Sequence, residues 1–203
     1  MAVKVTALRY FDGLAEEAAG ARRRVRPAEN DPAHSRRPPA RIKDVVRRVY
    51  LETAIPSAYE TTRTDASSIH RRNLTRSWWV DQRPRYDVWI SEAVVLELAQ
   101  GDWPGKAGAL ELVGPLRRVP ITDEVVNVAR RYVRERLVPA DLQGDALHLA
   151  AACIYEFDFL LTWNIRPLAN PTKLGHLTVI NRRLGLLTPQ VVTPEMLWVE
   201  DET

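Results

Sequence analysis

Asp145-Ala146-Leu147-His148-Leu149-Ala150-Ala151-Ala152-Cys153-Ile154, followed closely by Phe159-Leu160-Leu161-Thr162-Trp163-Asn164, is the part of the chain from which the architecture can be inferred. The first segment predicts a helix, since Asp145 follows Gly144 and the apolar residues after it are good helix formers. The second predicts a short buried strand that ends in a polar residue. A helix followed by a strand returns the chain to the sheet from which it left. We therefore expect Asp145 and Asn164 to face one crevice, at the edge where open α/β sheets bind ligands.

Strands and helices alternate in the rest of the sequence as well. Further strands are predicted at residues 45–51, 86–90 and 191–192, with a link or edge strand at 119–121. Further helices are predicted at residues 65–79, 91–101, 104–113, 122–133 and 171–184. Pro56 is expected to mark a turn, and residues 193–195 to open a last helical turn. This alternation predicts an α/β sandwich with a mostly parallel sheet.

The composition is that of one soluble globular domain with a tail. Of the 203 residues, 45% are hydrophobic and 27% are charged, which are ordinary values for a soluble domain. The single cysteine, Cys153, excludes a disulfide framework and fits a reducing compartment. No apolar run reaches the ~18 residues of a membrane span, and Arg9 and Asp12 interrupt what would be the middle of a signal peptide. We therefore expect a cytoplasmic protein that does not enter the membrane.

The positive charge is concentrated at the front of the chain. Residues 1–49 hold 12 Lys and Arg against 6 Asp and Glu, a balance of +6, whereas the rest of the chain holds 17 against 20, a balance of −3. The run Arg22-Arg23-Arg24-Val25-Arg26 is followed by four prolines within residues 27–39. This composition predicts a basic, disordered extension over residues 1–44 and a folded domain over residues 45–203. A solvated tail is the preferred interpretation of the arginines, and an arm that touches nucleic acid is the alternative.

Carboxylates are the best candidates for the chemistry. The sequence has no glycine-rich nucleotide loop, no Gly-x-Ser-x-Gly elbow and no zinc-type spacing among its histidines and cysteine. Glu52 ends the first predicted strand, Glu97 lies in the helix after the second, and Asp145 opens the central helix. If the three carboxylates converge, their repulsion requires a cation, and such hard oxygen ligands suit Mg²⁺ or Mn²⁺. The alternative is that they are solvated residues or partners of helix dipoles.

Five motifs occur in an order that resembles a known family. They are Glu52-Thr53-Ala54-Ile55-Pro56-Ser57, Ser91-Glu92 through Glu97-Leu98 to Gly101-Asp102, Asp145-Ala146-Leu147-His148-Leu149-Ala150, Leu160-Leu161-Thr162-Trp163-Asn164 and Thr193-Pro194-Glu195. Together they resemble a PIN domain, specifically the VapC-like toxins of bacterial type II toxin–antitoxin systems, over about residues 46–199. The resemblance implies a PIN-like three-layer α/β/α sandwich with a mostly parallel central sheet.

The resemblance also implies an activity. PIN domains hold Mg²⁺ or Mn²⁺ on clustered acids and cleave RNA, so the chain is expected to be a metal-dependent endoribonuclease, a hydrolase of RNA phosphodiester bonds. Glu52 stands at the first acid of the family, Glu97 at the second and Asp145 at the third, and these three would hold the metal. Asn164 stands where many members have a fourth acid. VapC-like proteins usually form homodimers and are inhibited by a cognate antitoxin, so RNA, an antitoxin and a second copy are the expected partners.

Two residues depart from the family pattern. Glu52 is one methylene longer than the usual aspartate and Asn164 is uncharged, and both are expected to lower metal affinity or activity. Asn164 therefore leaves a second function open, that of a catalytically silent PIN-fold module that binds RNA or an antitoxin. His148, one turn into the central helix, is interpreted as fixing the helix or the sheet edge, with a position facing the crevice as the alternative. Arg63 and Arg166 are candidates for phosphate contacts, although solvation is the preferred interpretation.

Overall fold

The central feature of the protein is a sheet of five short parallel strands. The computed structural model describes residues 46–139, 143–165 and 171–199, so the predicted extension over residues 1–44 lies outside the described part. The strand order is β3-β2-β1-β4-β5, and all pairings are parallel. The strands are β1 (Arg48–Leu51), β2 (Asp87–Ser91), β3 (Arg117–Val119), β4 (Phe159–Leu161) and β5 (Gln190–Val192).

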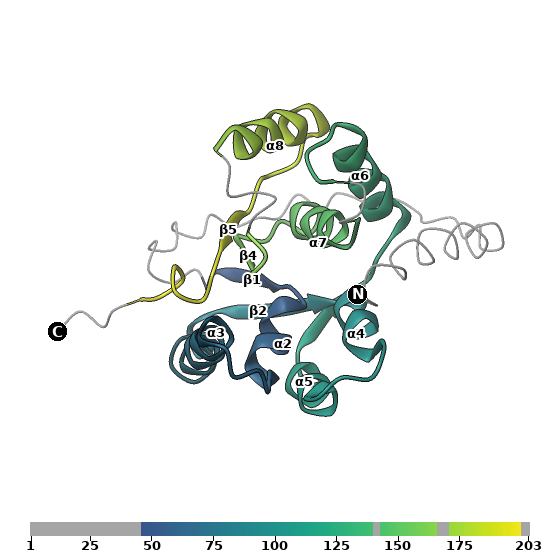
Figure 1. The fold of residues 1–203 in the computed structure, drawn as a ribbon. Coiled ribbons are helices and arrows are strands. Elements are labelled where there is room, and N and C mark those ends of the chain that lie inside the picture. The colour runs from purple at the N-terminus through teal and green to yellow at the C-terminus, as the bar shows by residue number, and fades with distance from the viewer. Residues whose placement is uncertain (1–45, 140–142, 166–170, 200–203) are drawn as a thin grey trace, which may run out of the picture.

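Helices cover both faces of this sheet (Figure 1). One layer consists of α2 (Ala54–Glu60), α3 (Ala66–Ser77), α4 (Glu92–Ala99) and α5 (Lys106–Val113). The other consists of α6 (Asp123–Arg134), α7 (Gln143–Ile154) and α8 (Pro171–Leu184). A π-helical turn, η2 (Trp78–Gln82), and a 3-10 turn, η3 (Arg83–Arg85), lead from α3 towards β2. The predicted fold class, a three-layer α/β/α sandwich with a parallel central sheet, is confirmed.

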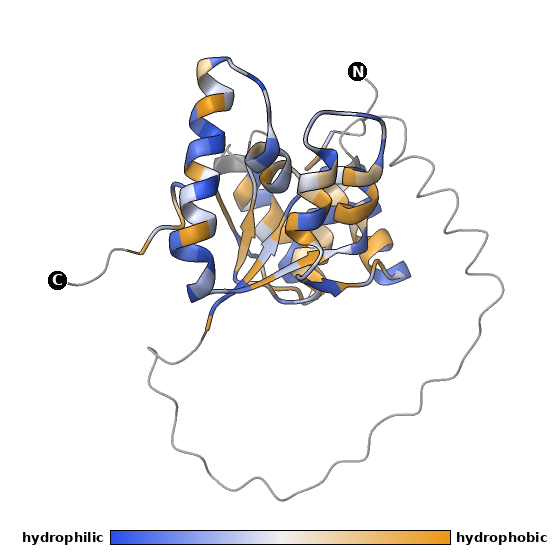
Figure 2. Cartoon of the chain, turned by 90° about the horizontal axis from the view of Figure 1, so that it is seen from below, coloured by the Kyte–Doolittle hydropathy of each residue, from blue (hydrophilic) through white to orange (hydrophobic). Residues whose placement is uncertain are grey.

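The core lies where α7 packs on the middle of the sheet. Val49, Tyr50 and Leu51 of β1 have no exposed surface, because β1 is paired on both edges, with β2 and β4, and helices cover both faces of the sheet. In α7, every residue from Ala146 to Cys153 is buried, which explains why this helix is apolar nearly all round. Hydrophobic residues accordingly gather at the centre of the molecule (Figure 2). Within the described residues, every helix is too short or too polar to cross a membrane.

The predicted turn at Pro56 is a helix instead. α2 begins at Ala54, and Pro56 falls in its first turn, where a backbone N–H has no partner within the helix. A proline there costs no hydrogen bond, so the residue that signals a turn elsewhere is tolerated. Glu52 and Thr53 consequently lie at the junction between the end of β1 and the start of α2.

The predicted helical turn at residues 193–195 is an isolated turn. Met196 and Leu197 both donate their backbone N–H to the carbonyl of Thr193, at 3.0 and 3.1 Å. The backbone groups that follow this turn bind side chains of η2 in place of helical partners. Trp78 Nε1 donates to the Leu197 carbonyl at 2.9 Å, and the amide of Gln82 pairs with both backbone groups of Val199.

Candidate functional site

The candidate site lies at the carboxyl edge of the sheet, between β1 and β4. From β1 the chain adds β2 and then β3 on one side, and it later adds β4 and β5 on the other. The connections therefore diverge between β1 and β4, and such a switch point is where open parallel sheets bind ligands. Glu52 directly follows β1, and Thr162 directly follows β4.

Glu52 is a buried carboxylate held by two hydrogen-bond donors. It is 8% exposed, and its Oε2 accepts from the Thr162 hydroxyl at 2.7 Å and from the backbone N–H of Ala54 at 3.0 Å. Thr162 is itself fixed, because its hydroxyl accepts the backbone N–H of Asn164 at 2.8 Å. Burial raises the pKa of Glu52 above its ordinary value. The end of β4 thus orients an acid at the end of β1.

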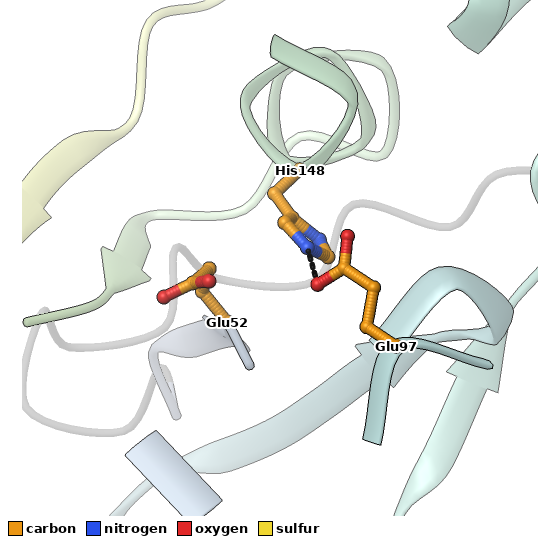
Figure 3. Close-up of side chains that lie close together, drawn as sticks. All are labelled: Glu52, Glu97 and His148. Atoms are coloured by element: carbon orange, nitrogen blue, oxygen red, sulfur yellow. Dashed lines mark hydrogen bonds and ion pairs between the residues drawn. The ribbon is translucent and has the colours of Figure 1, made fainter. Parts of the chain in front are cut away.

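Glu97 reaches the same place from α4. Its Oε2 accepts from the Thr53 hydroxyl at 2.6 Å and contacts His148 Nε2 at 3.0 Å (Figure 3). Burial pushes the pKa of Glu97 upwards, but the neighbouring His148 and the two hydrogen bonds outweigh it, so the pKa is lowered. A methyl group on Gly144 would lie 3.0 Å from Glu97 Oε1. The glycine before Asp145 therefore leaves room for this carboxylate.

His148 connects the acids to the core of the sheet. It is 1% exposed. Its Nδ1 lies 2.7 Å from the Tyr50 hydroxyl, which lies 2.7 Å from the Ser91 hydroxyl. Burial alone would lower the pKa of His148, but Tyr50 and Glu97 raise it well above its ordinary value. A continuous chain of polar contacts thus runs from Ser91 at the end of β2, through β1 and α7, to Glu97 on α4.

Asp145 and Asn164 form a pair beside this cluster. Asn164 Nδ2 donates to Asp145 Oδ2 at 2.7 Å, so the start of α7 and the end of β4 meet as the sequence predicted. Both residues line a recess of about 20 Å³ together with Glu52 and His148. Burial and the nearby charge of Glu52 raise the pKa of Asp145 to about 6. The carboxylate is therefore destabilised as long as only protein groups surround it.

The donor set at this edge fits a divalent cation. One carboxylate oxygen each from Glu52 and Glu97 and one ring nitrogen of His148 all lie within 4.8 Å of one another. Of the residues predicted for the site, Glu52 and Glu97 join this cluster, whereas Asp145 and Asn164 line the adjoining recess. The sequence interpretation preferred a fixing role for His148 and kept a position facing the crevice as the alternative; the structure places its ring with the acids, one helical turn after Asp145 on the same helix. That spacing was the signal for its place in the cluster.

A larger groove opens next to the acids. It has a volume of about 620 Å³ and shares Thr53 and Glu97 with the site. Arg63, Arg71 and Trp163 also line it, and the Arg71 guanidinium lies 5.6 Å from the centre of the Trp163 ring. The second arginine considered for phosphate contacts, at position 166, lies outside the described residues. The groove can therefore hold an extended ligand along the acidic site.

Comparisons with known proteins concern the fold. No protein-family model matches the sequence, and no curated protein matches it. Among solved structures, the chain is similar to VapC20 of Mycobacterium tuberculosis, a sarcin–ricin-loop-cleaving toxin, with 18% identity, a TM-score of 0.44, and 60% of this chain and 93% of that chain covered. It is also similar to a chain of VapBC2 from Rickettsia felis, solved bound to a DNA fragment from the VapBC2 promoter. The identity is 13% and the TM-score 0.40, and the match covers 72% of this chain and 98% of that chain.

Proposed function

We propose that this chain is a metal-dependent endoribonuclease that acts as the toxin of a toxin–antitoxin pair. The observation that carries the proposal is the convergence of Glu52, Glu97 and His148 within 4.8 Å, beside Asp145 and at the switch point of a parallel sheet. Three carboxylates against one histidine leave this edge with an excess of negative charge, which a bound divalent cation would neutralise. The ordered motifs that resemble VapC-like toxins support the same function.

Glu52, Glu97 and Asp145 are the proposed ligands of Mg²⁺ or Mn²⁺. A divalent ion held there would supply a Lewis acid for the phosphoryl oxygens and a water molecule of lowered pKa. The protein's own contribution is to fix the carboxylates before the substrate arrives. Thr162 holds Glu52 and Thr53 holds Glu97, each through a hydroxyl that donates to Oε2. Such supporting hydrogen bonds typically account for 10- to 100-fold in metal affinity or activity.

The groove supports a polymeric substrate. Its volume of about 620 Å³ is larger than a single nucleotide needs, and both Glu97 and the exposed Arg63 line it. Arg63 and Arg71 would contact phosphates and the Trp163 side chain would support a base, the combination that single-stranded nucleic acid requires; all three line the groove. We therefore propose that an RNA strand lies in this groove with one phosphodiester at the acids. A cognate antitoxin and a homodimer are proposed on the resemblance of the motifs.

A second candidate function rests on the Asn164–Asp145 hydrogen bond. Where a fourth acid would add charge, Asn164 donates its amide to Asp145 Oδ2. A site with one charge fewer holds a divalent ion more weakly. The chain would then be a catalytically silent PIN-fold module that binds RNA or an antitoxin through the same groove.

A cleavage assay on the purified full chain separates the two functions. Single-stranded RNA is incubated with Mn²⁺ or with EDTA, and the product ends are mapped. The nuclease predicts Mn²⁺-dependent products that disappear with EDTA and with Asp145→Asn, while the exposed-surface variant His70→Gln keeps them. RNA binding without cleavage at any Mn²⁺ concentration would support the silent module. Products that persist in EDTA and in Asp145→Asn would point to a contaminating nuclease and count against the proposal.

A further inference from the structure

We propose that His148 is a nitrogen ligand of the metal, so that the site binds Mn²⁺ and similar transition ions in preference to Mg²⁺. The inference rests on the proposed metal site and deepens it. His148 Nε2 lies 3.0 Å from Glu97 Oε2, and both lie within 4.8 Å of a Glu52 carboxylate oxygen. Neighbouring ligands on an octahedral ion with bonds of about 2.1 Å are about 3.0 Å apart, and opposite ligands about 4.2 Å. His148 Nε2 and Glu97 Oε2 therefore have the spacing of neighbouring ligands, and a small side-chain movement would bring the Glu52 oxygen, within 4.8 Å of both, onto the same ion.

The surroundings of the ring match those of a metal-bound imidazole. A ligating histidine characteristically has its other ring nitrogen held by a hydrogen bond, which fixes the tautomer and the ring orientation. Here Nδ1 lies 2.7 Å from the Tyr50 hydroxyl, and that hydroxyl lies 2.7 Å from Ser91. With Nδ1–H donating to Tyr50 and Tyr50 donating to Ser91, Nε2 faces Glu97, to which it donates a hydrogen bond in the metal-free protein. A metal ion bound there would displace the Nε2 proton and take its place between the ring and the carboxylate. The ring is 99% buried, since its exposure is 1%, so this orientation is held firmly.

The chemistry of the donor set gives the metal preference. Mg²⁺ favours oxygen ligands, whereas imidazole nitrogen suits first-row transition ions, and Mn²⁺ accepts carboxylate oxygen as well. A site made only from Glu52, Glu97 and Asp145 would accept Mg²⁺ and Mn²⁺ with little discrimination. Adding Nε2 of His148 favours Mn²⁺. A histidine that only supported Glu97 through a hydrogen bond would give no such preference.

Two measurements on the metal-loaded full chain test the inference. Electron spin-echo spectroscopy of bound Mn²⁺ should show modulation from a directly coordinated imidazole nitrogen, and this modulation should vanish in His148→Gln. Calorimetric titration should show tighter binding of Mn²⁺ than of Mg²⁺ to the wild type. His148→Gln should weaken Mn²⁺ binding by at least on the order of 10-fold and change Mg²⁺ binding much less. His70→Gln, on exposed α3, is the matched control and should change neither.

The possible results separate this inference from the proposed function. Bound Mn²⁺ without nitrogen modulation, in a protein that cleaves RNA, would overturn the inference and leave the nuclease intact. Nitrogen modulation in a protein that cleaves no RNA would support the inference and count against the nuclease. Equal losses of Mn²⁺ and Mg²⁺ affinity in His148→Gln would reduce His148 to a positioning residue for Glu97. The wild-type spectrum decides the question even where the variant fails to fold.

Discussion

The Thr162 hydroxyl donates a 2.7 Å hydrogen bond to the buried Glu52 carboxylate, although the two residues are 110 positions apart in the sequence. The bond joins the carboxyl ends of β1 and β4 at the switch point of the sheet. It is also one of the interactions that keep Glu52 ionisable in spite of its burial. Thr162, at the end of β4, thus orients Glu52, the acid at the end of β1 that the proposed metal site needs.

Thr162→Val should therefore weaken metal binding although every carboxylate of the site is retained. Valine has a similar shape but no donor, so Glu52 loses an orienting bond and its pKa rises further. Mn²⁺ affinity should fall by about 10- to 100-fold, and the free energy of unfolding by about 1–3 kcal/mol. Calorimetric titration and urea unfolding measure the two effects. Thr178→Val on the exposed side of α8 is the control, and equal behaviour of both variants would contradict the prediction.

Asp145→Asn should stabilise the metal-free protein at neutral pH. The pKa of Asp145 is about 6 in the fold, against an ordinary value of 3.8, so between these values the native state holds a proton that the unfolded chain releases. Stability therefore falls as the pH rises through this window and stays lower above it. The asparagine variant avoids this loss, by about 1–3 kcal/mol at pH 7.5, but gains little at pH 4.

Thermal unfolding of both proteins in EDTA, at pH 4 and at pH 7.5, measures this difference. At pH 7.5 the variant should unfold several degrees above the wild type, at about 2–4 °C for each kcal/mol. Added Mn²⁺ should reverse the order, because the wild type, with Asp145 as an additional ligand, binds the ion more tightly than the variant and is stabilised more. Identical midpoints at both pH values would show that Asp145 is not destabilised in the fold.

The carboxylates of this site could be predicted from the sequence, whereas the threonine hydroxyls that orient them by hydrogen bonds could not. Glu52 and Asp145 stand at the ends of predicted elements, next to short apolar runs, and such positions are readable locally. The roles of Thr53 and Thr162 depend on contacts with residues far away in the chain, and an isolated threonine carries no sign of its partner. For the same reason the order β3-β2-β1-β4-β5 was not predicted. Strand pairings are long-range contacts that local patterns do not determine.

Gly144→Ala should weaken metal binding without lowering the stability of the metal-free protein. Alanine is a better helix former than glycine, by up to ~1 kcal/mol, but its methyl group would lie 3.0 Å from Glu97 Oε1. Glu97 must then shift, so we expect Mn²⁺ affinity to fall by roughly 10-fold, as for a lost supporting interaction, while the metal-free thermal midpoint does not drop. The matched control is Gly175→Ala in α8, where an added methyl group meets no atom within 4 Å. Unchanged Mn²⁺ binding in Gly144→Ala would show that Glu97 is not a ligand or that it moves freely.

Removal of residues 1–40, nearly all of the predicted extension, should leave the domain intact. β1 begins at Arg48, whose backbone N–H donates to Asp158 at 2.8 Å, and the core described by the structure lies between Val49 and Leu197. A chain that begins at residue 41 should therefore keep its thermal midpoint and its Mn²⁺-dependent cleavage. The loss we expect is in salt-sensitive RNA affinity, because the arginine run is removed. A large drop in the thermal midpoint would show that the extension packs on the domain.

Asn164→Asp should restore the acid that the family pattern contains and reveal which function the wild type has. Asn164 donates to Asp145 at 2.7 Å, so an aspartate there would replace a hydrogen bond by two facing carboxylates. In EDTA at pH 7.5 the variant should unfold at a lower temperature than the wild type, because like charges this close destabilise each other. With Mn²⁺ the order should reverse, since an added carboxylate strengthens binding of the cation. Paired thermal scans in EDTA and in Mn²⁺ measure both effects.

Cleavage by the same variant then distinguishes the nuclease from the silent module. Activity in the wild type, with a lower Mn²⁺ requirement in Asn164→Asp, identifies a working enzyme whose site binds its metal weakly. If Asn164→Asp cleaves RNA and the wild type does not, the wild type is a silent module that lost nuclease activity because residue 164 is not an acid. Asn164→Ala is the matched control, because it removes the amide without adding charge and should weaken Mn²⁺ binding by freeing Asp145 from its partner. Metal titrations that neither substitution changes would place Asn164 outside the site, since its only proposed influence runs through the 2.7 Å bond to Asp145.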